Sequence, residues 1–174
     1  MAHNEIDVDA APEAVFGVLA DPRSYARWVV GSRAIRRADR GWPNPGTAFD
    51  HTVGIGPLRL KDHSEAVECE PPRLLRLRVK ARPLTVAWVT LRMTQLDRKR
   101  TRITMDEHPA DMRSRIFLNP LSDPLVRLRN RESLRRLKAL AERREPIPTG
   151  TLPARESDAE AFVEASSRPA PPAG

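Results

Sequence analysis

The segment LLRLRVKAR (residues 74–82) shows most directly how this chain folds. Its odd-numbered positions from Leu75 to Ala81 are apolar, and its even-numbered positions from Arg76 to Arg82 are basic. Successive side chains of a strand point to opposite faces of the sheet, so this alternation predicts a strand with one buried and one solvated face. Antiparallel sheets commonly have one wet face, whereas parallel sheets are covered on both. The segment therefore predicts an antiparallel sheet with a core on one side.

The same alternation extends outward from this strand in both directions. It begins at residues 3–9 and runs through most of residues 32–108, interrupted by Gly- and Pro-rich turn signals at residues 41–46, 54–57 and 71–72. Consecutive strands joined by short turns are antiparallel. These residues therefore predict a curved antiparallel sheet of about six to seven strands.

Helices are predicted at both ends of this sheet. Pro12 and then Asp21-Pro22 begin two short helices after the first strand, since Pro favours a first helical turn and Asp caps one. A long C-terminal helix follows Ser122-Asp123-Pro124 and continues for about 20 residues without Gly or Pro. One face of it carries a run of inward-facing side chains: Val126, Asn130, Leu134, Leu137 and Ala141. We expect Leu125 and Leu128, nearly opposite, to pack locally near the entrance of a cavity. The fold class is thus α+β.

The composition sets the domain boundaries and the compartment. Residues 1–145 are predicted to form one domain, and the Pro- and Ala-rich residues 146–174 a disordered tail. We find no apolar run long enough to cross a membrane and no N-terminal signal sequence. The lone Cys69 has no internal disulfide partner, so we expect a cytoplasmic protein.

The net charge of +7 comes from 30 Lys and Arg residues against 23 Asp and Glu. Most of the positive charge is Arg scattered over strands and helices, which favours a solvated surface. Aromatic residues make up only 5%, too few to stack single-stranded bases well. We therefore expect no specific nucleic-acid partner and a monomer or weak homodimer. An alternative is that the Arg-rich C-terminal helix binds an anionic surface.

Several short motifs resemble the START-like, or SRPBCC, superfamily, closest to the members called polyketide cyclase/dehydrase. The matching stretches are APEAVF (11–16), LADP (19–22), YARW (25–28), ECEPPRL (68–74), TRITM (101–105) and NRESLRRL (130–137). The order of predicted elements matches as well, over roughly residues 3–144. The resemblance implies a helix-grip fold, in which the curved sheet wraps around the long C-terminal helix. Its members include both binders and enzymes, so the resemblance alone does not decide the activity.

A long helix laid across a curved sheet leaves a cleft lined by inward side chains, the kind of mostly apolar space that small molecules occupy. Strand parity and the helical wheel give the predicted ligand-binding residues: Trp28, Phe49, His51, Asp62, Leu77, Val89, Met105, Glu107, Asn130 and Leu134. Trp28 has a second interpretation, as a side chain that closes the core. The expected ligand is a lipid, polyketide or aromatic metabolite.

Four of these residues are polar on an otherwise apolar lining: His51, Asp62, Glu107 and Asn130. Burying such groups without partners costs about 1–3 kcal/mol each, so they must bond to each other, to water or to a ligand. His51, Asp62 and Glu107 are the candidate catalytic residues, with His51 as a general base and a carboxyl group orienting it. The alternative is that bulges or frayed strand ends turn these side chains to solvent.

The sequence favours binding over catalysis, with a cyclase or dehydratase as the alternative. No pair of His or acidic residues has the spacing of metal ligands, and neither a metal nor a cofactor is expected. The convergence of His51, Asp62 and Glu107 in space would distinguish an enzyme from a carrier.

Overall fold

The computed structural model describes residues 2–55, 58–81, 85–110 and 123–143. Strand β1 (Ala2–Val8) leads to helix α1 (Pro12–Leu19), the 3-10 turn η1 (Pro22–Ser24) and the short helix α2 (Tyr25–Trp28). Six strands follow: β2 (Ser32–Ala38), β3 (Ala48–Ile55), β4 (Leu58–Glu70), β5 (Leu74–Ala81), β6 (Thr85–Asp97) and β7 (Arg100–Pro109). Helix α4 (Asp123–Arg143) comes last. The predicted tail, residues 146–174, lies outside the described residues.

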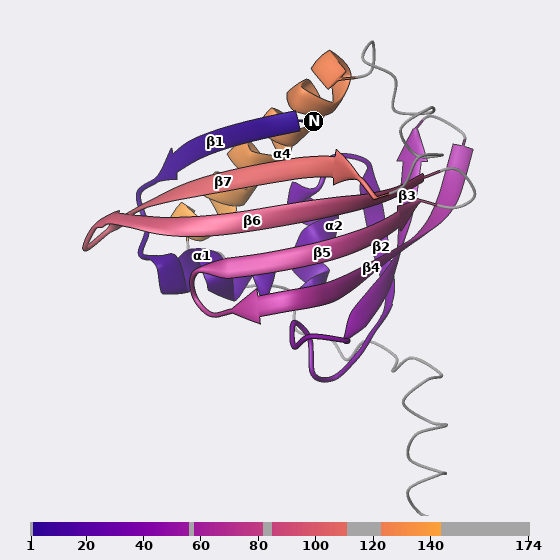
Figure 1. Ribbon diagram of the computed structural model, residues 1–174, viewed down its shortest axis with the longest axis horizontal. Helices are drawn as coiled ribbons and strands as arrows, with labels where there is room; N and C mark the ends of the chain where they lie inside the picture. Colours follow the sequence, from indigo (N-terminus) through magenta and orange to yellow (C-terminus); the bar gives the residue numbers. More distant parts are fainter. Residues whose placement is uncertain (1, 56–57, 82–84, 111–122, 144–174) are drawn as a thin grey trace, which may run out of the picture.

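The seven strands form one antiparallel sheet in the order β1-β7-β6-β5-β4-β3-β2 (Figure 1). Strands β2 to β7 follow one another as a meander, and β1 closes the far edge by pairing with β7. Register shifts interrupt the β2–β3 pairing and the β4–β5 pairing between Ala66 and Glu68. Such bulges bend a strand and increase its twist, which helps the sheet curve around a helix.

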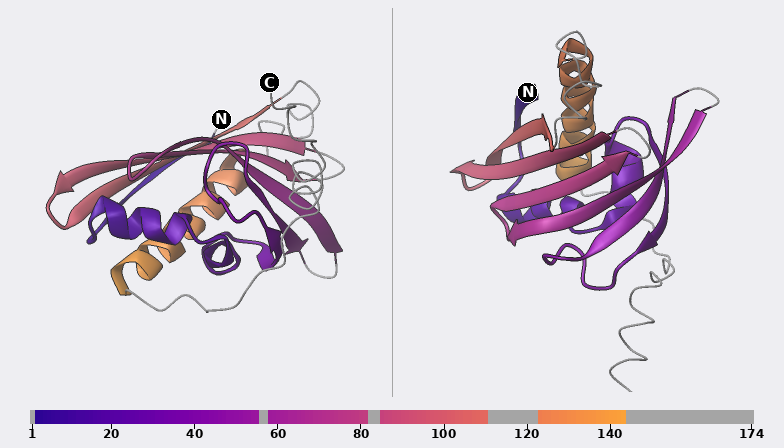
Figure 2. Two further views of the ribbon diagram at one scale, coloured as in Figure 1. Left: turned by 90° about the horizontal axis from the view of Figure 1, so that it is seen from below. Right: turned by 45° about the vertical axis from the view of Figure 1, so that its right-hand side comes forward.

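The helices lie on one face of the sheet, and the sheet curves around α4 (Figure 2). Pro12 occupies the first turn of α1, and Asp21 caps η1 by accepting a hydrogen bond from the Arg23 amide at 2.8 Å. Helix α4 packs against β1, α1 and α2. This arrangement confirms the predicted α+β helix-grip fold.

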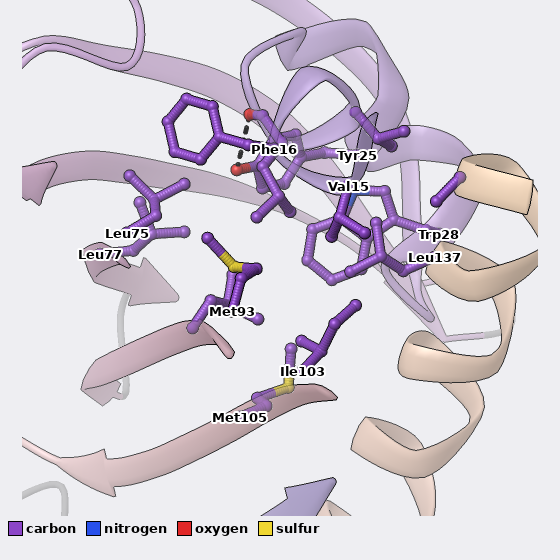
Figure 3. Close-up of a cluster of buried hydrophobic side chains, with 14 of the residues drawn as sticks. Val15, Phe16, Tyr25, Trp28, Leu75, Leu77, Met93, Ile103, Met105 and Leu137 are labelled. Atoms are coloured by element: carbon purple, nitrogen blue, oxygen red, sulfur yellow. Dashed lines mark hydrogen bonds between the residues drawn. The ribbon is translucent and has the colours of Figure 1, made fainter. Parts of the chain in front are cut away.

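The core lies between the concave face of the sheet and the three helices. Figure 3 shows it as one cluster whose members come from both layers: Val15, Phe16, Tyr25 and Trp28 from the helices after β1, Leu75, Leu77, Met93, Ile103 and Met105 from the strands, and Leu137 from α4. Leu75, Leu77 and Val79 thus face inward, as the alternation predicts.

Helix α4 presents the predicted face to the core. Asn130, Leu134, Leu137 and Ala141 are buried. The expectation that Leu125 and Leu128 pack locally is wrong: they are 70% and 63% exposed, because the helix points them away from the sheet. In the described part of the chain, no helix is both long and apolar enough to cross a membrane.

Candidate functional site

A cavity of about 180 Å³ lies between α2, α4 and the concave face of the sheet. Its apolar wall includes Trp28 and side chains that alternate along the strands: Val53, Leu77, Val79, Val89 and Met105. Leu77 and Val89 are direct cross-strand neighbours, so together they form a continuous patch of this wall. For comparison, an apolar cavity of about 150 Å³ binds benzene, so this space matches one or two fused rings.

The polar part of the lining begins with a His–Asp pair on β3 and β4. The two strands pair in register from Ile55 and Leu58, which places His51 directly opposite Asp62. His51 Nε2 lies 3.5 Å from Asp62 Oδ2, and both side chains are buried and line the cavity. Asp62 Oδ1 accepts a hydrogen bond from the His63 amide at 2.7 Å. The sequence-predicted groups therefore meet, and Oδ2 is the oxygen that faces His51.

Two serine hydroxyls hold the imidazole of His51 from either side. Ser32 Oγ lies 3.2 Å from Nδ1, and Ser64 Oγ lies 3.2 Å from Nε2. Because a hydroxyl can both donate and accept, these contacts suit either tautomer of the neutral ring. The ring is thus fixed in orientation without needing a charge.

Burial shifts both pKa values of this pair, in opposite directions. The pKa of His51 is lowered to about 4, mainly by desolvation, and the positive charge of Arg36 acts in the same direction. Desolvation also raises the pKa of Asp62 to about 7, although the His63 amide and the charge of Arg129 oppose this rise. The contact is an ion pair only if His51 is protonated, and burial disfavours the protonated imidazole. These shifts favour an uncharged imidazole near neutral pH and a carboxyl group that titrates there.

A second polar cluster joins β7 to α4. Asn130 Nδ2 donates to Glu107 Oε2 at 2.8 Å, and the Arg129 guanidinium donates to the same oxygen. Arg129 also donates to Asn130 Oδ1, at 3.1 Å from Nε and 2.9 Å from Nη2. The three side chains form a closed ring in which the carboxylate is neutralised by a cation. No hydrogen bond among the described residues joins this cluster to the His–Asp pair, although both line the same cavity.

Most sequence-predicted residues lie on the cavity wall, and two do not. Trp28, His51, Asp62, Leu77, Val89, Met105, Glu107 and Asn130 all line it. Phe49 and Leu134 are buried in the core behind the lining, with 0% and 1% exposure. Parity identifies inward residues but not how deep each lies, which explains this difference. Contact with a ligand stays a prediction for all ten.

Three polar lining residues were missed from the sequence: Ser64, Ser133 and Arg129. Ser64 shares the inward parity of Asp62, and Ser133 is three residues after Asn130 and four before Leu137, on the same side of the helix, so both had a usable signal. Ser133 Oγ accepts a hydrogen bond from the Val30 amide at 3.1 Å, which ties α4 to the end of α2. Arg129 had no such signal in the sequence, because its long side chain folds from the helix surface towards Glu107.

Trp28 both closes the core and lines the cavity, so its two predicted roles apply together. It is 2% exposed, its ring lies 4.9 Å from that of Tyr25, and it also lines the cavity. Its Nε1–H has no hydrogen-bond partner among the described residues, which is unusual for a buried donor. By contrast, the Tyr25 hydroxyl donates to the Leu19 carbonyl at 3.2 Å. The indole is therefore held in place by packing and by its ring contact with Tyr25.

The described residues contain no group of three His, Cys, Asp or Glu side chains that could hold a metal ion. What the site holds is a mostly apolar space with a carboxyl group whose pKa is raised by burial, an imidazole whose pKa is lowered by burial, and an amide–carboxylate cluster. Such a set of groups can orient an oxygen-bearing ligand and can exchange a proton with it.

Comparison with solved structures supports the same architecture. The chain is similar to the Zhui aromatase/cyclase from Streptomyces sp. R1128, with a TM-score of 0.65 and 19% identity over 86% of this chain and 98% of that one. It is also similar to a conserved protein from Geobacillus kaustophilus, with a TM-score of 0.62 and 15% identity over 81% and 94% of the two chains. A third similar structure is the di-domain ARO/CYC BexL from the BE-7585A biosynthetic pathway. There the TM-score is 0.64 at 15% identity, over 79% of this chain and 45% of that one. At these identities the likeness shows the fold alone.

No curated protein matches the sequence. The family described as polyketide cyclase / dehydrase and lipid transport matches residues 2–142, which is nearly the whole of the described chain. The match spans the sheet, the cavity and helix α4 together. The chain therefore belongs to the polyketide cyclase/dehydrase and lipid transport family.

Proposed function

We propose that the chain binds a small, largely apolar molecule of one or two fused rings that carries a hydroxyl or carbonyl group. The observation that carries this proposal is the cavity of about 180 Å³, whose wall is mostly apolar and whose few polar groups converge from β3, β4, β7 and α4. Membership of a family described by polyketide and lipid functions supports the same class of ligand.

The polar groups explain why the ligand carries oxygen. The polar side chains that line the cavity, His51 and Asp62 among them, can donate a hydrogen bond to a ligand oxygen or accept one from a ligand hydroxyl. The Arg129 charge is already neutralised by Glu107, so an anionic ligand finds no unused cation in this cluster. A neutral molecule with one acceptor oxygen therefore fits better than a carboxylate or a phosphate.

Calorimetric titration with 2-naphthol tests this proposal. We expect saturable binding with a Kd of about 1–100 μM, and weaker binding of naphthalene, which lacks the hydroxyl. Val89→Trp places a large ring on the patch of wall that Val89 shares with Leu77, and the volume it takes from the cavity is expected to weaken binding at least about tenfold.

The matched control is Val67→Trp, because Val67 is 38% exposed and lies outside the cavity. It adds the same ring to the surface and is expected to bind 2-naphthol as the parent does. Equal affinities for the parent and a folded Val89→Trp protein would show that the molecule binds elsewhere.

A second candidate function is acid–base catalysis, and the His51–Asp62 pair is the observation that favours it. A catalytic acid or base works best with a pKa near the working pH, and burial brings that of Asp62 to about 7. We infer that Asp62, rather than His51, is the base: its carboxylate removes a proton from a carbon between two carbonyls. The resulting enolate attacks the carbon of a further carbonyl group in the same molecule, and the oxygen of that carbonyl takes up the proton. His51 orients Asp62.

A short poly-β-keto thioester, followed by mass spectrometry of its cyclised products, tests this chemistry. Asp62→Asn is expected to slow cyclisation at least about a hundredfold while 2-naphthol binding is kept. If the parent gives no more cyclised product than buffer alone, or Asp62→Asn is fully active, the protein is a carrier and not a cyclase.

A further inference from the structure

The first two turns of α4 carry an exposed apolar ridge, formed by Leu125 and Leu128. Their side chains are 70% and 63% exposed, whereas the other exposed large hydrophobic residues of the described chain, Val67 and Leu96, are 38% and 42% exposed. Residues three apart on a helix are neighbours on its surface, so the two leucines form one ridge. Figure 2 (right) shows this end of α4, the darker orange end, projecting past the strands.

Positive charge surrounds this ridge. Arg127 and Arg131 lie beside the leucines along the helix, and both are exposed. One turn further on, Arg135 and Arg136 share the single carboxylate of Glu132, at 3.5 and 3.0 Å. The helix as a whole has seven Arg and Lys residues against three Asp and Glu, a difference of +4. An apolar ridge among arginines is the composition of a helix that lies on an anionic lipid surface.

The charge also decides between possible occupants. A second copy of the chain would bring an equally basic helix to the interface, and like charges across an interface are unfavourable. An anionic bilayer offers the opposite charge to the arginines and an apolar layer to the two leucines. Charge complementarity therefore favours a membrane over self-association.

We propose that the ridge docks the protein onto anionic phospholipid membranes. The same two turns of α4 contribute Val126, Arg129 and Asn130 to the cavity wall on the opposite side of the helix, so a docked bilayer is separated from the cavity by the width of α4. Docking itself does not depend on the ligand.

Co-sedimentation with vesicles tests the docking. We expect the protein to bind phosphatidylcholine vesicles containing about 30% phosphatidylserine, to bind pure phosphatidylcholine weakly, and to dissociate in high salt. The double variant Leu125→Ser/Leu128→Ser is expected to lose at least about tenfold in partitioning. Arg131→Gln tests the charge and is expected to weaken binding less, with a smaller dependence on salt.

The matched control is Leu96→Ser, which removes an exposed leucine from the end of β6, away from α4. It is expected to bind vesicles as the parent does. Binding of 2-naphthol without vesicles, measured on the same variants, separates loss of docking from loss of the ligand site. Vesicle binding unchanged in the double serine variant overturns the proposal. So does sedimentation showing that the parent is a dimer and this variant a monomer, because the ridge is then a self-interface.

Discussion

Replacing Phe49 with alanine is expected to lower the free energy of unfolding by about 3–5 kcal/mol. Phe49 is fully buried, and its ring lies 4.6 Å from Tyr25 and 4.7 Å from Trp42, tilted against the first and edge-on to the second. The substitution removes the transfer free energy of the ring, leaves a cavity between the sheet and α2, and breaks favourable aromatic contacts. The shift of the urea midpoint at constant slope measures the loss.

Leu128→Ala provides the control, because that side chain is exposed and the change is expected to stay within about 0.5 kcal/mol. Phe49 also separates folding from binding, since it lies behind the lining. In the folded fraction, Phe49→Ala is expected to bind 2-naphthol much as the parent does. A loss of stability below about 1 kcal/mol, together with abolished binding, would show that Phe49 contacts the ligand instead of supporting the core.

The fold could be predicted because each element carries an independent local signal. The alternation of Leu75, Leu77 and Val79 with basic residues specifies an inward face, and Pro12 and Asp21-Pro22 mark the helix starts. Short turns then leave an antiparallel meander as the simplest topology. The pairing of β1 with β7 joins segments about a hundred residues apart, so no local signal specifies it. There the family resemblance supplied what the local pattern lacks.

The contacts of the candidate site could be predicted within the β3–β4 hairpin but not between elements that lie far apart in the sequence. The register of β3 and β4, starting from Ile55 opposite Leu58, is enough to place His51 opposite Asp62. Glu107 and Asn130 come from β7 and α4, whose relative rotation is set by packing over the whole core. Sequence could show that each faces inward, but not that Asn130 donates to Glu107 rather than to Asp62. The protonation of Asp62 depends on this same packing, because desolvation is its main cause.

At pH 8, Asp62→Asn is expected to stabilise the protein by about 4 kcal/mol. Folding raises the pKa of Asp62 from 3.8 to about 7, and each pH unit of difference is worth about 1.4 kcal/mol. The stability contributed by protonated Asp62 is fully present below pH 3.8 and is lost as the pH rises through about 7. Asparagine keeps a carbonyl oxygen for the His63 amide and cannot ionise, so it avoids this loss. Urea titrations of both proteins at pH 4 and pH 8 measure the difference.

His51 has the opposite pH dependence. Folding lowers its pKa from 6.5 to about 4, so the unfolded chain takes up a proton first as the pH falls. Its contribution of about 3 kcal/mol is present above pH 6.5 and is lost as the pH drops towards 4. His51→Gln removes this contribution and leaves that of Asp62. This variant is therefore expected to lose stability as the pH rises from 4 to 7.

In the parent protein, the opposite effects of His51 and Asp62 on the pH dependence of stability are expected to cancel. Between pH 4 and 6.5 the unfolded chain carries one proton on His51 and none on Asp62, whereas the folded chain carries it on Asp62. The number of bound protons is then equal in the two states, and stability does not change with pH on account of this pair. The free energy of unfolding of Asp62→Asn is expected to fall as the pH decreases, whereas that of His51→Gln is expected to fall as the pH increases. Parallel profiles for the two variants would contradict the opposite pKa shifts of His51 and Asp62.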